Sequence, residues 1–205
     1  YPEKLVYSCR NGIVRSQSIF QLQAMAKESI GIFGGSFNPI HVGHVGLAEW
    51  VLENRADIEE LWLVVSPQNP FKQDKFLYPD ADRLEWARRA VKNNPKIKVC
   101  DIEMSLPKPS YTITTLDALK AQYPDYHFKI LIGGDNLPTF NKWKDYERIL
   151  SEYGVMVYPR EGSDTTETTM PNIEIRHGAP LFPISSTQIR EKIATGASLE
   201  DFLSI

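Results

Sequence analysis

The sequence predicts an α/β fold built on a doubly wound, mostly parallel β-sheet. From residue 29 onward, short apolar runs alternate with longer stretches whose apolar residues recur at helical spacing. This alternation is typical of parallel strands joined by right-handed crossover helices, which cover both faces of the sheet. Ligands of such folds bind beyond the carboxyl ends of the strands, so the loops that follow strands are where a site is expected.

The individual elements follow from periodicity and from the turn residues between them. Strands are expected at residues 30–33, 61–66, 98–104, 128–132 and 154–158, with a weaker one at 173–177 and a short one at 181–184. Helices are expected at residues 43–54, 81–93, 112–122, 146–152 and 186–195. These elements make residues 29–205 a single domain.

Residues 1–28 mix polar, basic and apolar side chains without a clear period. The chain does not begin with methionine, and the first methionine is Met25. We expect the functional domain to start near Met25. The preceding segment is then an N-terminal extension, either an upstream start-site artefact or an ordinary arm, and the sequence leaves both open.

Composition excludes several classes of function. The 205 residues are 42% hydrophobic and 24% charged, which suits one soluble globular domain. A formal net charge of −3 argues against bulk binding of nucleic acid. No apolar run approaches the ~18 residues of a membrane-spanning helix. The two cysteines make no disulfide framework and favour the reducing cytoplasm, whereas oligomeric state stays open.

The loop after the first strand of the domain, GIFGGSFNPIHVGH, is the most informative segment. Gly34 and Gly35 allow the backbone to turn and to approach a ligand closely. Pro39 precedes a helix start, where free amides attract anions. His41 and His44 lie three residues apart and share a face of its first turn. Together these groups could cradle a polyphosphate.

Two other interpretations of the histidine pair are weaker. A zinc site is disfavoured because the segment lacks the glutamate of HExxH and an obvious third ligand, so no protein-bound metal is expected. The histidines could also cap the helix and do no chemistry. The Gly-Gly turn, the proline and the strand-to-helix context together favour a ligand site over capping alone.

GGSFNPIHVGH resembles the GxFxPxHxGH motif of the nucleotidylyltransferase superfamily. In that superfamily the two histidines bind the nucleotide phosphates and stabilise the transition state. The resemblance implies a Rossmann-like nucleotidyltransferase fold and an ATP site formed by Gly34, Gly35, Ser36, Phe37, His41 and His44. The motif alone suits a pantetheine-phosphate adenylyltransferase or a cytidylyltransferase equally well.

A second signature lies about 140 residues later, at ISSTQIR. Ser185 followed by Gln188 fits a helix capping box, and Arg190 falls in the second turn of the same helix. The segment resembles the superfamily's [IV]SSTx[IV]R signature, whose hydroxyls and arginine hold the β- and γ-phosphates of ATP. The implied phosphate ligands are Ser185, Ser186, Thr187 and Arg190.

Three further segments resemble the nicotinate mononucleotide adenylyltransferases. IGGDNLPTFNKW is similar to GxDxxxxFxxW, which offers Asp135 to ribose hydroxyls and Trp143 to the pyridine ring, although core packing of Trp143 stays open. PSYTITTL is similar to SYTxxTL, in which amides near Tyr111 and Thr112 recognise the nicotinate carboxylate. SPQNPFK is similar to PxxxPHK, and Lys72 is carried over as a phosphate contact.

This chain also departs from the family. Thr114 stands where an acidic residue is common, Phe71 stands where histidine is common, and the C-terminus is short, which we expect to lower stability without touching the chemistry. Arg160 follows a predicted strand, and both a ligand contact and a surface position stay open for it.

The resemblance implies transfer of the adenylyl group of ATP to nicotinate mononucleotide, giving deamido-NAD and pyrophosphate. His41, His44 and Arg190 would be catalytic, and Mg²⁺ would be held mainly by the ATP phosphates. Three alternatives stay open. The acceptor could be nicotinamide mononucleotide or phosphopantetheine, and the chain could be a nucleotide-binding module without activity.

Overall fold

The computed structural model describes residues 5–10, 13–18, 29–67, 76–160 and 168–202. Within the N-terminal segment, β1 (Leu5–Arg10) pairs antiparallel with β2 (Ile13–Ser18) in a two-stranded sheet of their own. These strands were not predicted, because the segment shows no clear period in its sequence.

The domain is built on a six-stranded sheet in which every neighbouring pair of strands is parallel. The strand order is β5-β4-β3-β6-β7-β8, the doubly wound order whose direction of winding reverses between β3 and β6. The predicted fold class is therefore confirmed. The strands are β3 (Ser29–Gly35), β4 (Glu60–Val65), β5 (Ile97–Cys100), β6 (His127–Gly133), β7 (Val155–Tyr158) and β8 (Ile173–Ile175).

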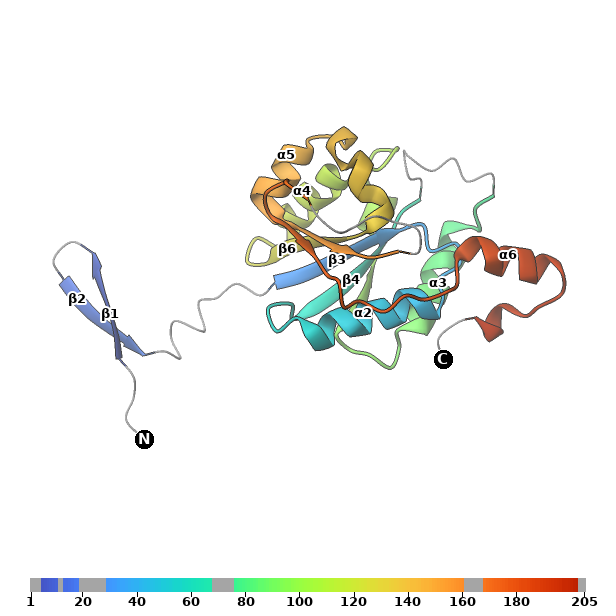
Figure 1. Ribbon diagram of the computed structural model, residues 1–205, viewed down its shortest axis with the longest axis horizontal. Helices are drawn as coiled ribbons and strands as arrows, with labels where there is room; N and C mark the ends of the chain where they lie inside the picture. The colour runs from blue at the N-terminus through green and yellow to red at the C-terminus, as the bar shows by residue number, and fades with distance from the viewer. Residues whose placement is uncertain (1–4, 11–12, 19–28, 68–75, 161–167, 203–205) are drawn as a thin grey trace.

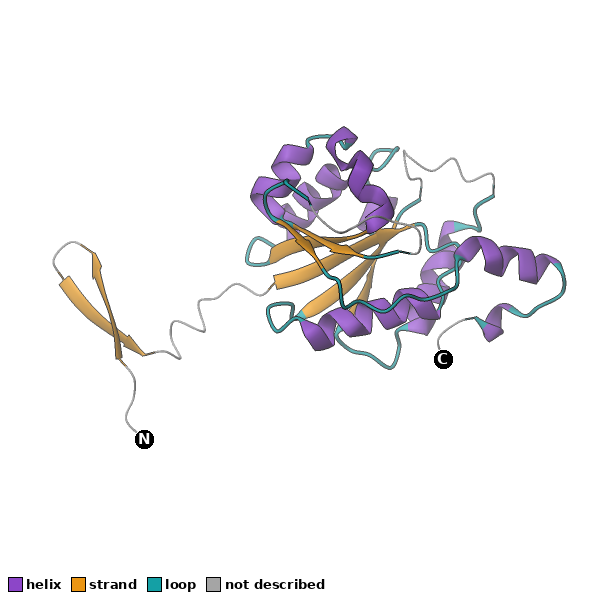
Figure 2. Cartoon of the chain, viewed as in Figure 1, coloured by secondary structure: helices purple, strands orange, loops and turns teal. Residues whose placement is uncertain are grey.

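Helices cover both faces of this sheet, as Figures 1 and 2 show. On one face lie α2 (Val42–Asn54) and α3 (Asp80–Ala90). The other face carries α4 (Thr112–Gln122), the 3₁₀-helix η2 (Gly134–Lys142), the short α5 (Tyr146–Arg148) and the π-helix η3 (Ile149–Tyr153). At the C-terminal end, α6 (Ser186–Ala194) precedes the short 3₁₀-helix η4 (Leu199–Asp201).

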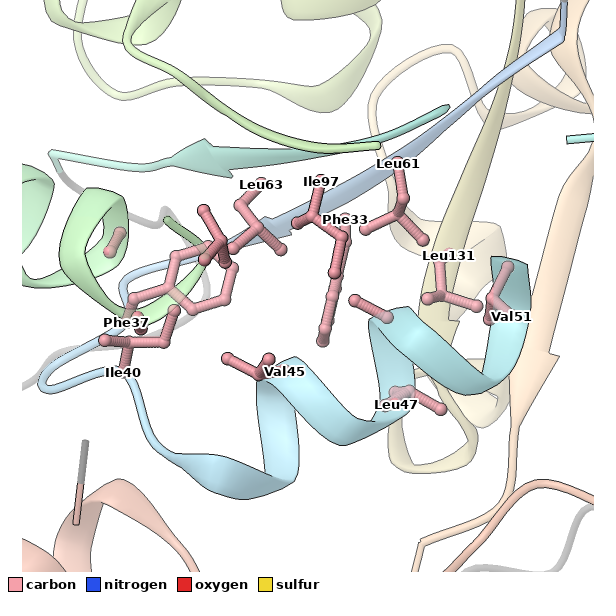
Figure 3. Packing of buried hydrophobic residues seen from close by; sticks show 14 of the residues in the cluster. Phe33, Phe37, Ile40, Val45, Leu47, Val51, Leu61, Leu63, Ile97 and Leu131 are labelled. Carbon is pink, nitrogen blue, oxygen red and sulfur yellow. The ribbon is translucent and has the colours of Figure 1, made fainter. Parts of the chain in front are cut away.

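The central strands are apolar on both sides, because helices bury both faces of the sheet. In β4, Leu61 and Leu63 pack toward α2 and α3, whereas Trp62 and Val64 pack toward α4 and η2. Figure 3 shows the first of these layers, with Leu61 and Leu63 above side chains of α2 such as Val45. Among the described residues, no helix is long and apolar enough to cross a membrane.

Several predicted boundaries were wrong. The strand expected at 98–104 ends at Cys100. Its last paired residue is Cys100, opposite Val64, and its partner β4 ends one residue later, at Val65. The 3₁₀-helix η1 (Ile102–Met104) follows. The strand expected at 181–184 is a loop, because Pro180 and Pro183 lack the N–H that a sheet ladder requires.

The other differences concern helices and β8. The helix expected at 146–152 is a single α-helical turn that continues as a π-helix. The 3₁₀-helix η2 was not predicted, and its Gly-Gly start and internal Pro138 are more typical of a loop. The strand expected at 173–177 is shorter, since β8 ends at Ile175. The helix expected at 112–122 has those bounds.

Candidate functional site

A cavity of about 460 Å³ opens at the carboxyl ends of the strands, at the switch point between β3 and β6. Its walls come from the loops after β3, β4, β6 and β7 and from the first turns of α2, α4 and α6. Almost all predicted site residues within the described part of the chain line it, namely Gly34, Gly35, Ser36, Phe37, His41, His44, Tyr111, Thr112, Trp143, Ser185, Ser186, Thr187 and Arg190.

The two histidines cap α2 through one nitrogen each. Nδ1 of His41 accepts the backbone N–H of Gly43 at 3.1 Å, and Nδ1 of His44 accepts the backbone N–H of His41 at 3.2 Å. A neutral imidazole that accepts at Nδ1 carries its proton on Nε2. Capping and ligand binding are therefore compatible, because the cap uses Nδ1, whereas the N–H donor of each ring is at Nε2.

His41 is held in its neutral form. Burial lowers its pKa to about 4, and the positive charge of Arg160 acts in the same direction. The side chain is almost fully buried, whereas Nε2–H can still donate to a ligand at neutral pH. A neutral donor of this kind binds an anion through a directed hydrogen bond.

The start of α6 is fixed directly against the loop that precedes α2. Ser186 Oγ donates to the carbonyl of Pro39 at 2.9 Å, and Nη1 of Arg190 donates to the carbonyl of Asn38 at 2.7 Å. Two segments about 150 residues apart in the chain thereby lie side by side, and both helices present their N-terminal turns to the cavity. Helix N-termini attract anions, so this pair suits a polyphosphate.

A buried arginine that the sequence analysis did not single out supports the glycine-rich loop. Arg83 of α3 is fully buried, and its guanidinium donates to the carbonyls of Ser36, Ser66 (2.9 Å) and Tyr78 (3.0 Å) and pairs with Asp80. It ties the loops after β3 and β4 to the start of α3. The signal in the sequence was its place four residues before Ala87, on the apolar face of the helix.

The opposite end of the cavity is polar and aromatic. Tyr111 precedes α4 and its side chain does not cap it, while Lys144 Nζ lies 4.9 Å from the centre of the Tyr111 ring. Trp143 is half-buried and packs against Phe140, with ring centroids 5.1 Å apart. Deeper in the wall, Thr115 Oγ1 donates to Glu103 Oε1 at 2.7 Å. Neither Glu103 nor Lys144 belongs to a motif that predicted a site residue.

One predicted residue is placed differently. Asp135 is exposed and does not line the cavity; its Oδ2 accepts from Nη1 of Arg160 at 3.2 Å. Gly133 permits this pair, since a Cβ there would lie 2.3 Å from Asp135 Oδ1 and 2.8 Å from Arg160 Cδ. Arg160 itself lines the cavity, where its partly exposed side chain is within reach of a ligand. Lys72 lies outside the described residues.

The charge of the cavity favours an anionic ligand. Among the described residues that line it, Lys144, Arg160 and Arg190 are cationic and only Glu103 is a carboxylate. In the part of the chain that the structure describes, no three histidine, cysteine, aspartate or glutamate side chains gather into a metal-binding group. The cavity is thus lined by hydrogen-bond donors and positive charge, the chemistry that holds phosphates.

A doubly wound fold with paired histidines and an arginine at its switch point defines a class of phosphate-binding proteins. The Cytidylyltransferase-like family model matches residues 32–192, and the chain belongs to this family. A Bacteroides fragilis protein named "Probable nicotinate-nucleotide adenylyltransferase" is 46% identical over 87% of this chain and 89% of its own length. A Cytophaga hutchinsonii protein of the same name is 44% identical over 85% of this chain and 91% of its own.

Among solved structures, the fold is similar to that of a nicotinic acid mononucleotide adenylyltransferase from Plasmodium falciparum complexed with NaAD. The TM-score is 0.68 at 24% identity, over 85% of this chain and 88% of that one. This similarity concerns the fold.

Proposed function

We propose that this protein transfers the adenylyl group of ATP to nicotinate mononucleotide and releases pyrophosphate, giving deamido-NAD. The observation that carries the proposal is the junction of α2 and α6, where His41, His44 and Arg190 line one cavity at two adjoining helix N-termini. The names of relatives at 46% and 44% identity support the same reaction and acceptor.

The mechanism is an in-line attack of a phosphate oxygen of the mononucleotide on the α-phosphorus of ATP. The obstacle is charge, because two like unit charges 4 Å apart repel by about 4 kcal/mol at an effective dielectric of 20. Nε2–H of His41 and His44, the guanidinium of Arg190 and the helix amides oppose that repulsion. No side chain forms a covalent bond with substrate, and catalysis consists of positioning and charge neutralisation.

The aromatic end of the cavity supports nicotinate mononucleotide as the acceptor. Backbone amides at Tyr111 and Thr112 would take the nicotinate carboxylate, and Trp143 would stack on the pyridine ring. Asp135 would bind ribose hydroxyls from the rim, and Lys72 would contact phosphate. Lys144 adds positive charge to this end, which favours the acid over the amide.

Mg²⁺ would enter with ATP and would lower the negative charge of its phosphates. His41, His44 and Arg190 would hold phosphate oxygens of ATP and not the ion itself. We place the reaction in the cytoplasm, the compartment that the cysteine content favours.

The test is pyrophosphate release by the purified protein with ATP and Mg²⁺. Nicotinate mononucleotide, nicotinamide mononucleotide and phosphopantetheine are supplied in parallel, and we expect a strong preference for the first. Preference for nicotinamide mononucleotide or phosphopantetheine would overturn the acceptor and keep the chemistry. ATP binding without release from any acceptor would identify a nucleotide-binding module without activity.

A further inference from the structure

Helix α2 carries two glycines, Gly43 and Gly46, against which a side chain from a distant segment is packed. A Cβ at Gly46 would lie 2.4 Å from Cζ of Phe182, and a Cβ at Gly43 would lie 2.9 Å from Cβ of Phe182. Both distances are shorter than real Cβ contacts, so the helix has room for Phe182 only because these positions have no side chain.

A glycine inside a helix needs a reason, since it costs about 1 kcal/mol relative to alanine. Gly43 belongs to the histidine motif, but Gly46 lies beyond it, and among its described surroundings the ring of Phe182 is what a Cβ would strike. Phe182 and Gly46 are therefore matched in size: the helix has no side chain at the point where the large aromatic ring of Phe182 packs.

Phe182 lies in residues 176–185, the segment between β8 and α6 that we call the strap, three residues before the N-cap residue Ser185. The next contacts along the chain are the bonds of Ser186 and Arg190 to the carbonyls of Pro39 and Asn38. Two neighbouring contacts thus hold this part of the chain: Phe182 of the strap packs on α2, and Ser186 and Arg190 of α6 bond to the loop that precedes α2.

We infer that Phe182 is a positioning residue, which by packing on Gly43 and Gly46 sets the distance between the two helix N-termini that bind the ATP phosphates. The inference rests on the proposed function and deepens it. Phe182 does not line the cavity, so it acts through α6 and touches no substrate. Phosphate-binding groups on two helices must keep a fixed separation, because a shift of about 1 Å can reduce rates by as much as ~10²-fold.

The first test compares Phe182→Ala with Leu181→Ala. Leu181 is the neighbouring strap residue, more exposed at 59% against 36% for Phe182, and is the matched control. We expect Phe182→Ala to raise the KM for ATP about tenfold. The KM for nicotinate mononucleotide and the melting temperature should stay near those of wild type, and Leu181→Ala should leave all three unchanged.

The second test uses the size match. Gly46→Ala displaces the ring of Phe182, so alone it should raise the KM for ATP to the level of Phe182→Ala. In the Phe182→Ala background the new methyl group meets no ring, and Gly46→Ala should then change the KM no further. It should also raise the melting temperature there, because alanine favours the helix.

Three results would overturn the inference. One is an unchanged KM for ATP in Phe182→Ala. The second is an effect of Gly46→Ala that is equal in both backgrounds. The third is a joint rise in both KM values with a lower melting temperature, which would make Phe182 a general stability contact. If the wild type transfers no adenylyl group, the proposed function fails by itself, and the dissociation constant of Mg·ATP from calorimetry replaces KM in the same cycle.

Discussion

The backbone N–H of His41 donates to Nδ1 of His44, and the two imidazole rings lie with their centroids 3.8 Å apart. Each ring therefore caps the helix with Nδ1 and can offer Nε2–H to a ligand. Histidine suits these positions because it supplies an acceptor and a donor on one rigid ring. Lysine and arginine provide donors only and could not complete the cap.

His44 provides the most direct test of the chemistry. We expect His44→Ala to lower kcat roughly 10²- to 10⁴-fold, because a preorganised hydrogen-bond donor to the ATP phosphates is lost. Initial rates of pyrophosphate release measure the effect. His177→Ala, at an exposed histidine outside the cavity, is the control and should retain full turnover. Wild-type turnover in His44→Ala would remove the histidine pair from the mechanism.

The buried, neutral state of His41 predicts a pH dependence of stability. The pKa of His41 is about 4 in the fold and 6.5 in the unfolded chain, so between these values the unfolded state binds more protons. The His41 contribution is complete above pH 6.5 and is lost as the pH falls toward 4, by up to about 3 kcal/mol.

Denaturant unfolding of the ligand-free protein at pH 7, 5.5 and 4.5 measures this loss. His41→Asn is the matched variant, since asparagine also caps a helix N-terminus but does not titrate. We expect the stability difference between wild type and variant to shift in favour of the variant as the pH falls. A difference that stays constant with pH would mean that His41 titrates normally in the fold.

A Trp143 variant tests whether the aromatic end of the cavity binds nicotinate mononucleotide and not ATP. We expect Trp143→Ala to raise the KM for nicotinate mononucleotide about tenfold, the loss of one stacking contact, with little change in the KM for ATP. Trp143→Phe keeps an aromatic face and should lose much less. An equal rise in both KM values would identify Trp143 as a packing residue, in line with its contact to Phe140.

The fold was predictable because a doubly wound sheet leaves a strong pattern in the sequence. Buried parallel strands such as β4 are continuous apolar runs, and α4 has the bounds that its periodicity predicted. The errors occurred where the deciding contact is not local. The end of β5 is set by its partner β4, and residues 181–184 looked like a strand because apolar content outweighed two prolines.

The residues of the candidate site were likewise predictable where the signal is local and not where it depends on the fold. His41, His44 and Arg190 were found because each belongs to a short motif beside a helix start. Arg160 and Glu103 each follow a strand but belong to no motif, and only the strand order brings them to the same cavity. The contact between Phe182 and Gly46 could not be predicted from the sequence, since nothing in either segment indicates that the two residues touch.

Arg83 should be the most sensitive charged residue for stability. Arg83→Met removes the donors to three carbonyls, those of Ser36, Ser66 and Tyr78, and leaves Asp80 without its partner. We expect the free energy of unfolding to fall by about 3 kcal/mol, because partly buried acceptors left without donors are costly. Arg88→Met is the control on the same helix. Its ion pair with Asp101 is solvated, and such pairs contribute little. Urea unfolding compares the two variants, and equal stabilities would show that the carbonyls find water in place of the guanidinium.

Because Arg83 also fixes the carbonyl of Ser36 in the glycine-rich loop, the folded Arg83→Met protein should bind Mg·ATP more weakly than Arg88→Met.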